Sequence, residues 1–142
     1  MLRYKIAIKL IAKELPIRTM KSAGVYYETR DKVMVVGKYF DLNDYGFIRH
    51  LGSIHKCPKA QDYSYTLWKI LHEVGHFKTE EKYGDNFANR EYFNDNARYM
   101  MRNVSLQNAF HNERNEWEAT NWAIKWIGAH PKLARVLNIL VK

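Results

Sequence analysis

The 142-residue sequence has little of what several classes of protein require. Its single cysteine, Cys57, cannot form an internal disulfide, which excludes a disulfide-stapled secreted scaffold. Three prolines and seven glycines are too few for a linker or a fibrous protein. No apolar stretch approaches about eighteen uncharged residues, so the sequence predicts no membrane-spanning helix, and we expect no membrane partner.

What the sequence does contain is typical of one folded domain. Hydrophobic residues make up 46% and aromatic residues 14%, which argues against disorder. A chain of this length can bury a stable hydrophobic core without disulfide bonds, so we expect a single domain over 1–142. The apolar run near the N-terminus is interrupted by Lys9 and Lys13, as a signal peptide would not be. We therefore expect a soluble, cytoplasmic protein.

Positive charge is in excess, with 23 Lys and Arg against 15 Asp and Glu, a formal charge of +8. This excess favours acidic partners. The sequence has no concentrated basic tail or arm of the kind that a dedicated nucleic-acid binder often carries. We expect the charge to steer encounter with an acidic protein segment, or to hold the protein near DNA. Direct nucleic-acid binding stays open.

The first half of the chain predicts one helix followed by strands. Residues 2–15 predict a helix, because lysines recur there every four residues, and Pro16 ends it. The alternation of lysines with Ile6 and Ile8 would also suit a strand. Runs rich in Val, Tyr and Phe at 24–29 and 32–40 predict two adjacent strands. Residues 41–64 have little periodicity and predict a long loop.

The second half predicts helices only. We expect them over 65–78, about 87–110, 112–128 and, beginning at a proline in its favoured first-turn position, 131–142. Helix, strands and then helices indicate an α+β domain with a small sheet.

The most specific motif is His72-Glu73-Val74-Gly75-His76, an HExxH inside the predicted helix 65–78. On a helix, residues i and i+4 lie about 40° apart, so His72 and His76 point the same way and can bind one metal ion. Glu73 lies about 100° round, beside the metal, where it can act on a water molecule. Gly75 falls on the ligand side, which predicts close approach of another element.

A catalytic zinc site usually takes three protein ligands. On a helical wheel of 112–128, Glu116 falls on the apolar stripe with Ala123 and Ile127, whereas Glu118 falls on the wet side. A buried carboxylate needs a partner, either a metal ion or a buried cation. His111 precedes the helix proper and remains a further candidate.

Glu116-Trp117-Glu118-Ala119-Thr120-Asn121-Trp122-Ala123 resembles the E-x-E-A-[ND]-x-[FW]-A signature that follows HExxH in ImmA/IrrE-type zinc metallopeptidases, intracellular gluzincin-like proteases of bacteria, phages and mobile elements. The helix TLWKILHEVGH is similar to the family's apolar lead into its motif. Thr120 stands where the family has Asn or Asp.

The resemblance implies a zincin-like α+β fold, in which an active-site helix lies beside a three-stranded sheet and a later helix supplies the third ligand. It implies that His72, His76 and Glu116 bind Zn²⁺ and that Glu73 is the catalytic general base. The implied activity is an endopeptidase, and the implied partner is a protein substrate such as a DNA-bound transcriptional repressor.

Two alternatives remain. One is a SprT-like metalloprotease that works at DNA and takes His111 as its third ligand. The other is a zincin-fold regulatory protein that binds a partner without turnover. Intact Glu73 argues against the second, because a non-catalytic protein has no need of the base.

Overall fold

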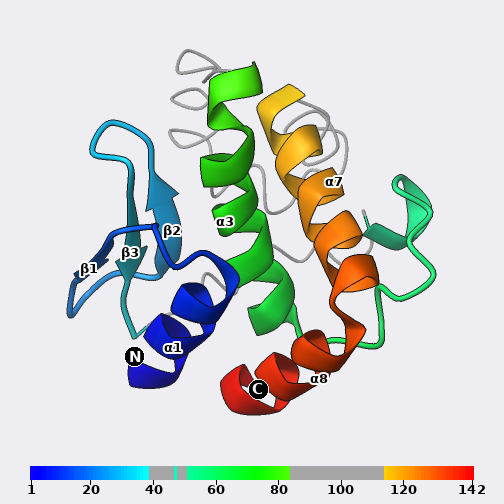
Figure 1. Ribbon diagram of the computed structural model, residues 1–142, viewed down its shortest axis with the longest axis horizontal. Helices are drawn as coiled ribbons and strands as arrows, with labels where there is room; N and C mark the ends of the chain where they lie inside the picture. The colour runs from blue at the N-terminus through cyan, green and yellow to red at the C-terminus, as the bar shows by residue number, and fades with distance from the viewer. Residues whose placement is uncertain (39–46, 48–50, 84–113) are drawn as a thin grey trace.

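The computed structural model describes residues 1–38, 47, 51–83 and 114–142, which form an α+β fold (Figure 1). The elements follow the chain in the order α1 (Leu2–Ile11), β1 (Ile17–Thr19), β2 (Val25–Glu28), β3 (Val33–Val36), α3 (Tyr65–Tyr83), α7 (Arg114–Ala129) and α8 (Pro131–Val141). The predicted α+β class is confirmed. The predicted helix over 87–110 lies outside the described residues, as do 41–46 and 48–50 of the predicted loop 41–64. The rest of that loop is described, and 51–53 in it are helical.

The sheet has three strands in the order β1-β3-β2. β1 pairs parallel with β3, and β2 pairs antiparallel with β3, with Tyr27 opposite Met34. Both predicted strands are present but shorter than their predicted ranges. The resemblance implied a third strand, but the position of β1 was not predicted, because three residues after a proline carry too short a pattern to show alternation.

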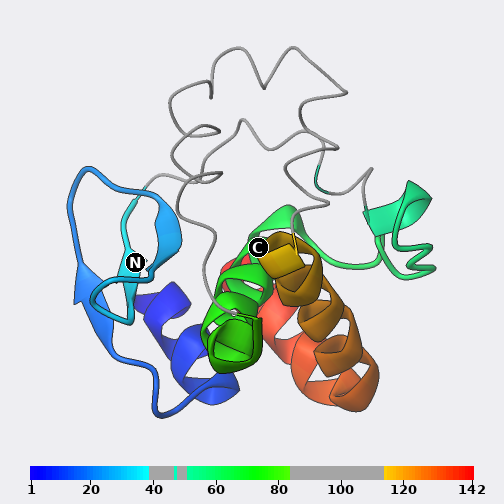
Figure 2. The same cartoon turned by 90° about the horizontal axis from the view of Figure 1, so that it is seen from above.

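α3 lies between the sheet on one side and α7 on the other, in both views of the ribbon (Figures 1 and 2). The side chains that face each other across these layers are large and apolar, and they form one continuous core. It includes Ile8, Leu15, Val25, Met34, Leu67, Trp68, Leu71, Val74, Ile127 and Leu137. This core holds α3 fixed, and α3 carries the HExxH motif.

α1 ends at Ile11, earlier than the predicted residue 15. The backbone of Ala12 leaves the helical region at φ −142° and ψ 84°, while its N–H still donates to the Ile8 carbonyl. Lys9 then folds over this end, and its ammonium donates to the carbonyl of Leu15 at 2.6 Å. Lys9 belongs to the lysine periodicity that predicted a longer helix, but its ammonium instead binds a backbone carbonyl beyond the end of α1.

The two C-terminal helices match the predicted ones closely. α7 covers the predicted 112–128 from Arg114 onward, and α8 begins at Pro131, where a missing N–H costs nothing. α3 runs on to Tyr83, one and a half turns past its predicted end. Among the helices in the described part of the chain, none is long and apolar enough to cross a membrane.

Candidate metal centre

α3 brings two histidines together at the middle of the fold. His72 and His76 are one helical turn apart, with their ring centroids 4.7 Å from each other and their planes at 85°. Both are buried, with 4% and 7% of their surface exposed. Imidazoles are amphipathic, and two of them buried side by side require polar partners. A carboxylate from α7 is such a partner for both rings.

Glu116, in the first turn of α7, lies directly against both histidines and is buried. Its Oε2 is 2.7 Å from Nε2 of His72 and 3.2 Å from Nε2 of His76. The three residues each offer a ligand atom, and these atoms lie within 4.8 Å of one another. The structure therefore brings together the three residues that the sequence predicted as ligands, and this cluster could hold a metal ion.

The close contact between α3 and α7 depends on Gly75. A Cβ atom placed on Gly75 would lie 2.5 Å from the carbonyl oxygen of Ala119, closer than real contacts allow. The backbone of α7 therefore passes directly over the glycine, one turn from Glu116. The sequence-based expectation that another element approaches closely at Gly75 is confirmed, and this approach sets the distance between Glu116 and the histidines.

Thr120 supports His72 from the other side of the ring. It is fully buried, and its Oγ1 lies 3.0 Å from Nδ1 of His72. A hydroxyl can donate or accept, so it can serve either tautomer of the imidazole. When Nδ1–H donates to the hydroxyl, the lone pair of Nε2 is left for a metal ion. Thr120, which departs from the family signature, thus provides a hydrogen-bond partner for Nδ1 of His72, the ring nitrogen that does not face Glu116.

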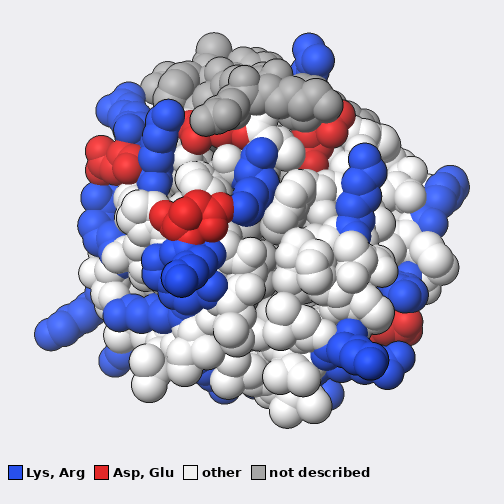
Figure 3. All heavy atoms as spheres, in the orientation of Figure 1, with Lys and Arg blue, Asp and Glu red and all other residues white. Residues whose placement is uncertain are grey.

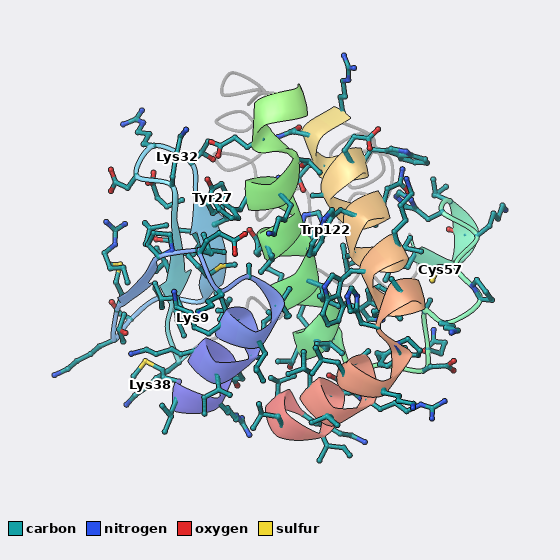
Figure 4. The ribbon with its side chains drawn as sticks, viewed as in Figure 1. Lys9, Tyr27, Lys32, Lys38, Cys57 and Trp122 are labelled. Carbon is teal, nitrogen blue, oxygen red and sulfur yellow. The ribbon has the colours of Figure 1, made fainter. Side chains whose placement is uncertain are left out.

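Glu73 is held on the side of α3 that faces the sheet. Its carboxylate is buried and accepts two hydrogen bonds, from the backbone N–H of Tyr27 at 2.9 Å and from the Lys69 ammonium at 2.8 Å. Figure 4 shows Tyr27 on β2, next to α3. The pairing of Lys69 with Glu73 at i, i+4 is visible in the sequence. The Tyr27 contact is not, because a backbone N–H carries no residue signature.

Burial and charge act in opposite directions on the two carboxylates. Burial raises the pKa of Glu73, but the Lys69 ammonium and then the histidines more than offset it, and the pKa falls to about 2. Burial likewise raises the pKa of Glu116, and the two histidines bring that pKa well below its ordinary value. Both groups are therefore anionic at neutral pH. Burial lowers the pKa of His72, which favours the neutral ring that binds metal.

The residues present fit a divalent metal ion. Two imidazoles and one carboxylate form a common three-ligand set for catalytic zinc, which leaves a fourth position for water or substrate. Ligand atoms arranged tetrahedrally at about 2.0–2.1 Å from zinc would be about 3.3 Å apart. The 3.2 Å between His76 and Glu116 matches this spacing, and the 2.7 Å between His72 and Glu116 is somewhat shorter. Thr120 provides the second contact that oriented ligands usually have.

Aromatic side chains around the cluster pack in the core. Phe47 meets the edge of the His72 ring, with centroids 5.2 Å apart. Trp68, one turn before His72 on α3, is fully buried and donates from its indole N–H to the carbonyl of Ala60. Trp126 on α7 is buried as well. The alternative ligand His111 lies outside the described residues.

No protein-family model, curated protein or solved structure matches the chain. The resemblance to ImmA/IrrE-type metallopeptidases therefore rests on the residues of the two motifs, one on α3 and one on α7. What the structure adds is that these motifs meet in space.

Proposed function

We propose that the protein is a zinc-dependent endopeptidase of the ImmA/IrrE type, with His72, His76 and Glu116 as zinc ligands and Glu73 as general base. The observation that carries the proposal is the buried cluster of two histidines and a glutamate, contributed by an HExxH helix and a facing ExEA helix. Zn²⁺ in such a site lowers the pKa of a coordinated water towards about 7 and polarises a carbonyl group.

The chain's own residues have distinct roles in this proposal. Glu116 supplies negative charge from a second helix and so fixes the site across the α3–α7 contact. Thr120 orients the His72 ring. Glu73, next to the first ligand, takes a proton from the attacking water and later delivers it to the leaving amine. The proposed substrate is a peptide bond in another protein, such as a DNA-bound transcriptional repressor.

One observation favours a second candidate, a metal-binding zincin-fold protein without turnover. Both carboxylate oxygens of Glu73 are engaged, by Lys69 and by the Tyr27 N–H, and its pKa is about 2. A carboxylate held in this way is a weak base. In the endopeptidase, these contacts have to loosen when the substrate binds, whereas in a binding protein they persist.

A cleavage assay separates the two candidates. Zinc-loaded wild-type protein and Glu73→Gln would be incubated with a proteome-derived peptide library, and new peptide termini would be read by mass spectrometry. We expect wild type to generate a defined set of termini and Glu73→Gln to retain zinc but lose them, by roughly 10²–10⁴-fold. Equal cleavage by both proteins would contradict the role of Glu73, and absence of cleavage by wild type would favour the binding protein.

A further inference from the structure

We propose that the outer face of α1 and α8 binds the surface of an anionic lipid bilayer. This face is formed by the exposed residues of α1 and α8, together with Lys142 at the end of α8. The inference is independent of the metal centre, whose residues lie on α3 and α7.

Folding gathers most of the net charge on this face. α1 and α8 with Lys142 carry six cationic side chains and no acidic side chain, and the net charge of the whole chain is +8. The six are Arg3, Lys5, Lys9, Lys132, Arg135 and Lys142, of which Lys5 is half-buried and the other five are exposed. The next carboxylate after α1, that of Glu14, is ion-paired with Lys78. The two helices therefore present a surface of one sign.

The same two helices also carry most of the exposed aliphatic surface. Of the eight large hydrophobic side chains that are exposed among the described residues, five lie on α1 and α8. They are Leu2, Ile6, Leu10, Val136 and Ile139. The three on α1 are spaced at i, i+4 and i+8, and so form one stripe on the side opposite the buried Tyr4, Ala7 and Ile8. Each helix therefore has a second apolar side that is exposed in the described part of the chain.

α1 and α8 come from opposite ends of the sequence but pack against each other. Ala7 and Ile8 of α1 share the core with Leu137 and Val141 of α8, and the Arg3 guanidinium donates to the backbone carbonyl of Lys142 at 3.3 Å. Figure 1 shows both chain ends at this end of the molecule. In the space-filling view, the part of the surface over α1 and α8 shows blue basic side chains among uncharged atoms (Figure 3).

The chemistry of this face selects among anionic partners. A nucleic acid would cover the cations but would leave the aliphatic side chains against phosphates, where they gain nothing. A second copy of the chain would bury the aliphatics but would bring two sets of six cations together. A bilayer interface accepts both, because lysine and arginine reach the anionic headgroups while leucine, isoleucine and valine enter the acyl boundary.

The degree of exposure also favours a bilayer over an acidic protein helix. Leu2 and Ile139 are 72% and 80% exposed, so these side chains project past their neighbours. Projecting side chains on two separate helices can each enter a fluid interface without a matching surface, whereas a partner helix needs knobs and holes that fit. The sequence-based expectation of no membrane partner rested on the lack of a spanning run, and interfacial binding does not need one.

Vesicle flotation tests the inference with the full chain. The probes are vesicles of phosphatidylcholine alone and vesicles of equal parts phosphatidylcholine and phosphatidylglycerol. We expect wild type to float with the anionic vesicles and not with the neutral ones, and the bound fraction to fall as salt is raised. Failure of wild type to bind anionic vesicles overturns the inference.

Matched variants locate the binding surface. We expect Leu10→Ser with Ile139→Ser to weaken binding by roughly tenfold or more. Met20→Ser with Ile54→Ser removes two exposed hydrophobics elsewhere and should leave binding unchanged. Lys132→Gln with Arg135→Gln should weaken binding by roughly fivefold for each charge. Because the charge variants spare all apolar groups, they also decide the matter if the serine variant misfolds. Equal binding by wild type and the charge variants would overturn the inference.

Discussion

His72 makes a polar contact at each ring nitrogen, and through these two contacts it joins Glu116 and Thr120 in the candidate site. Nε2 faces Glu116 and Nδ1 faces the Thr120 hydroxyl. All three side chains are buried, so none can exchange its partner for water. In such an environment a lost partner costs more than a hydrogen bond does on average, because the remaining group stays desolvated.

Thr120→Val tests the contact with His72 Nδ1. Valine has the same shape but no hydroxyl, so it leaves the ring without its orienting partner. We expect zinc affinity to fall by about 10–100-fold, as competition with a chromogenic chelator would measure. Thr120→Ser restores the hydroxyl and should lie near wild type. Unchanged affinity in Thr120→Val would mean that packing alone orients the ring.

Lys69→Met tests whether Lys69 is the counter-ion of Glu73. The side chains are 17% and 8% exposed, so removal of the cation leaves a carboxylate that is buried and lacks its ammonium. We expect the free energy of unfolding to fall by about 3 kcal/mol, as denaturant titration would show. Lys69→Met combined with Glu73→Gln should recover much of the loss. Additive losses in the double variant would show that the two residues do not interact.

Glu73 also predicts how stability depends on pH. Its pKa is about 2 in the folded protein, against an ordinary value of 4.5, so the unfolded chain binds a proton more readily. The contribution of Glu73 to stability is therefore complete above about pH 4.5 and is lost as pH falls towards 2. Measured on chelator-treated protein, unfolding midpoints should drop less steeply over this range in Glu73→Gln than in wild type. Identical slopes would contradict the lowered pKa.

At the scale of elements, the site depends on how closely α3 and α7 approach each other. Neither helix alone has a complete ligand set, because α3 supplies two ligands and α7 one. The backbones approach closely here, since Gly75 has no side chain and the carbonyl oxygen of Ala119 lies where a Cβ atom would meet it.

Gly75→Ala tests this close approach. On propensity alone the change would stabilise a helix by up to about 1 kcal/mol, but the new Cβ would clash with backbone that cannot rotate away. We expect net destabilisation of about 1–3 kcal/mol in thermal or chemical unfolding, together with weaker zinc binding.

Gly128→Ala is the matched control, because Gly128 lies on α7 with nothing within 4 Å of its would-be Cβ. It should be neutral or slightly stabilising. If both substitutions behave alike, the spacing of the helices does not depend on Gly75.

The elements differ in how far they could be predicted from sequence. α3, α7 and α8 have long apolar periodicities, and α8 also has a proline at its start, so the positions at which these helices begin were predicted closely, although α3 runs well past its predicted end. β1 has three residues and exists because β3 offers it a partner, which no local pattern can show. The same difference applies to the site. The burial of Glu116 could be predicted from its position on a helical wheel, which is a local pattern. The hydrogen bond from the Tyr27 N–H to Glu73 could not, because it joins two elements far apart in the sequence.

At the scale of the whole molecule, folding concentrates cationic side chains that are dispersed in the sequence. In the sequence the cations are spread along the chain, and no segment is basic enough to stand out. In the fold, the two ends of the chain pack together and bring six of them to one face with five exposed aliphatic side chains. The metal centre and this face are thus built from different pairs of helices.

The most direct test of the central claim is the zinc content of the purified protein after dialysis, measured by inductively coupled plasma mass spectrometry. The proteins compared are wild type, Glu116→Ala, Glu73→Gln and His111→Ala. If His72, His76 and Glu116 are the ligands, wild type, Glu73→Gln and His111→Ala retain about one zinc per chain and Glu116→Ala loses it. Full zinc in Glu116→Ala with loss in His111→Ala would contradict the account.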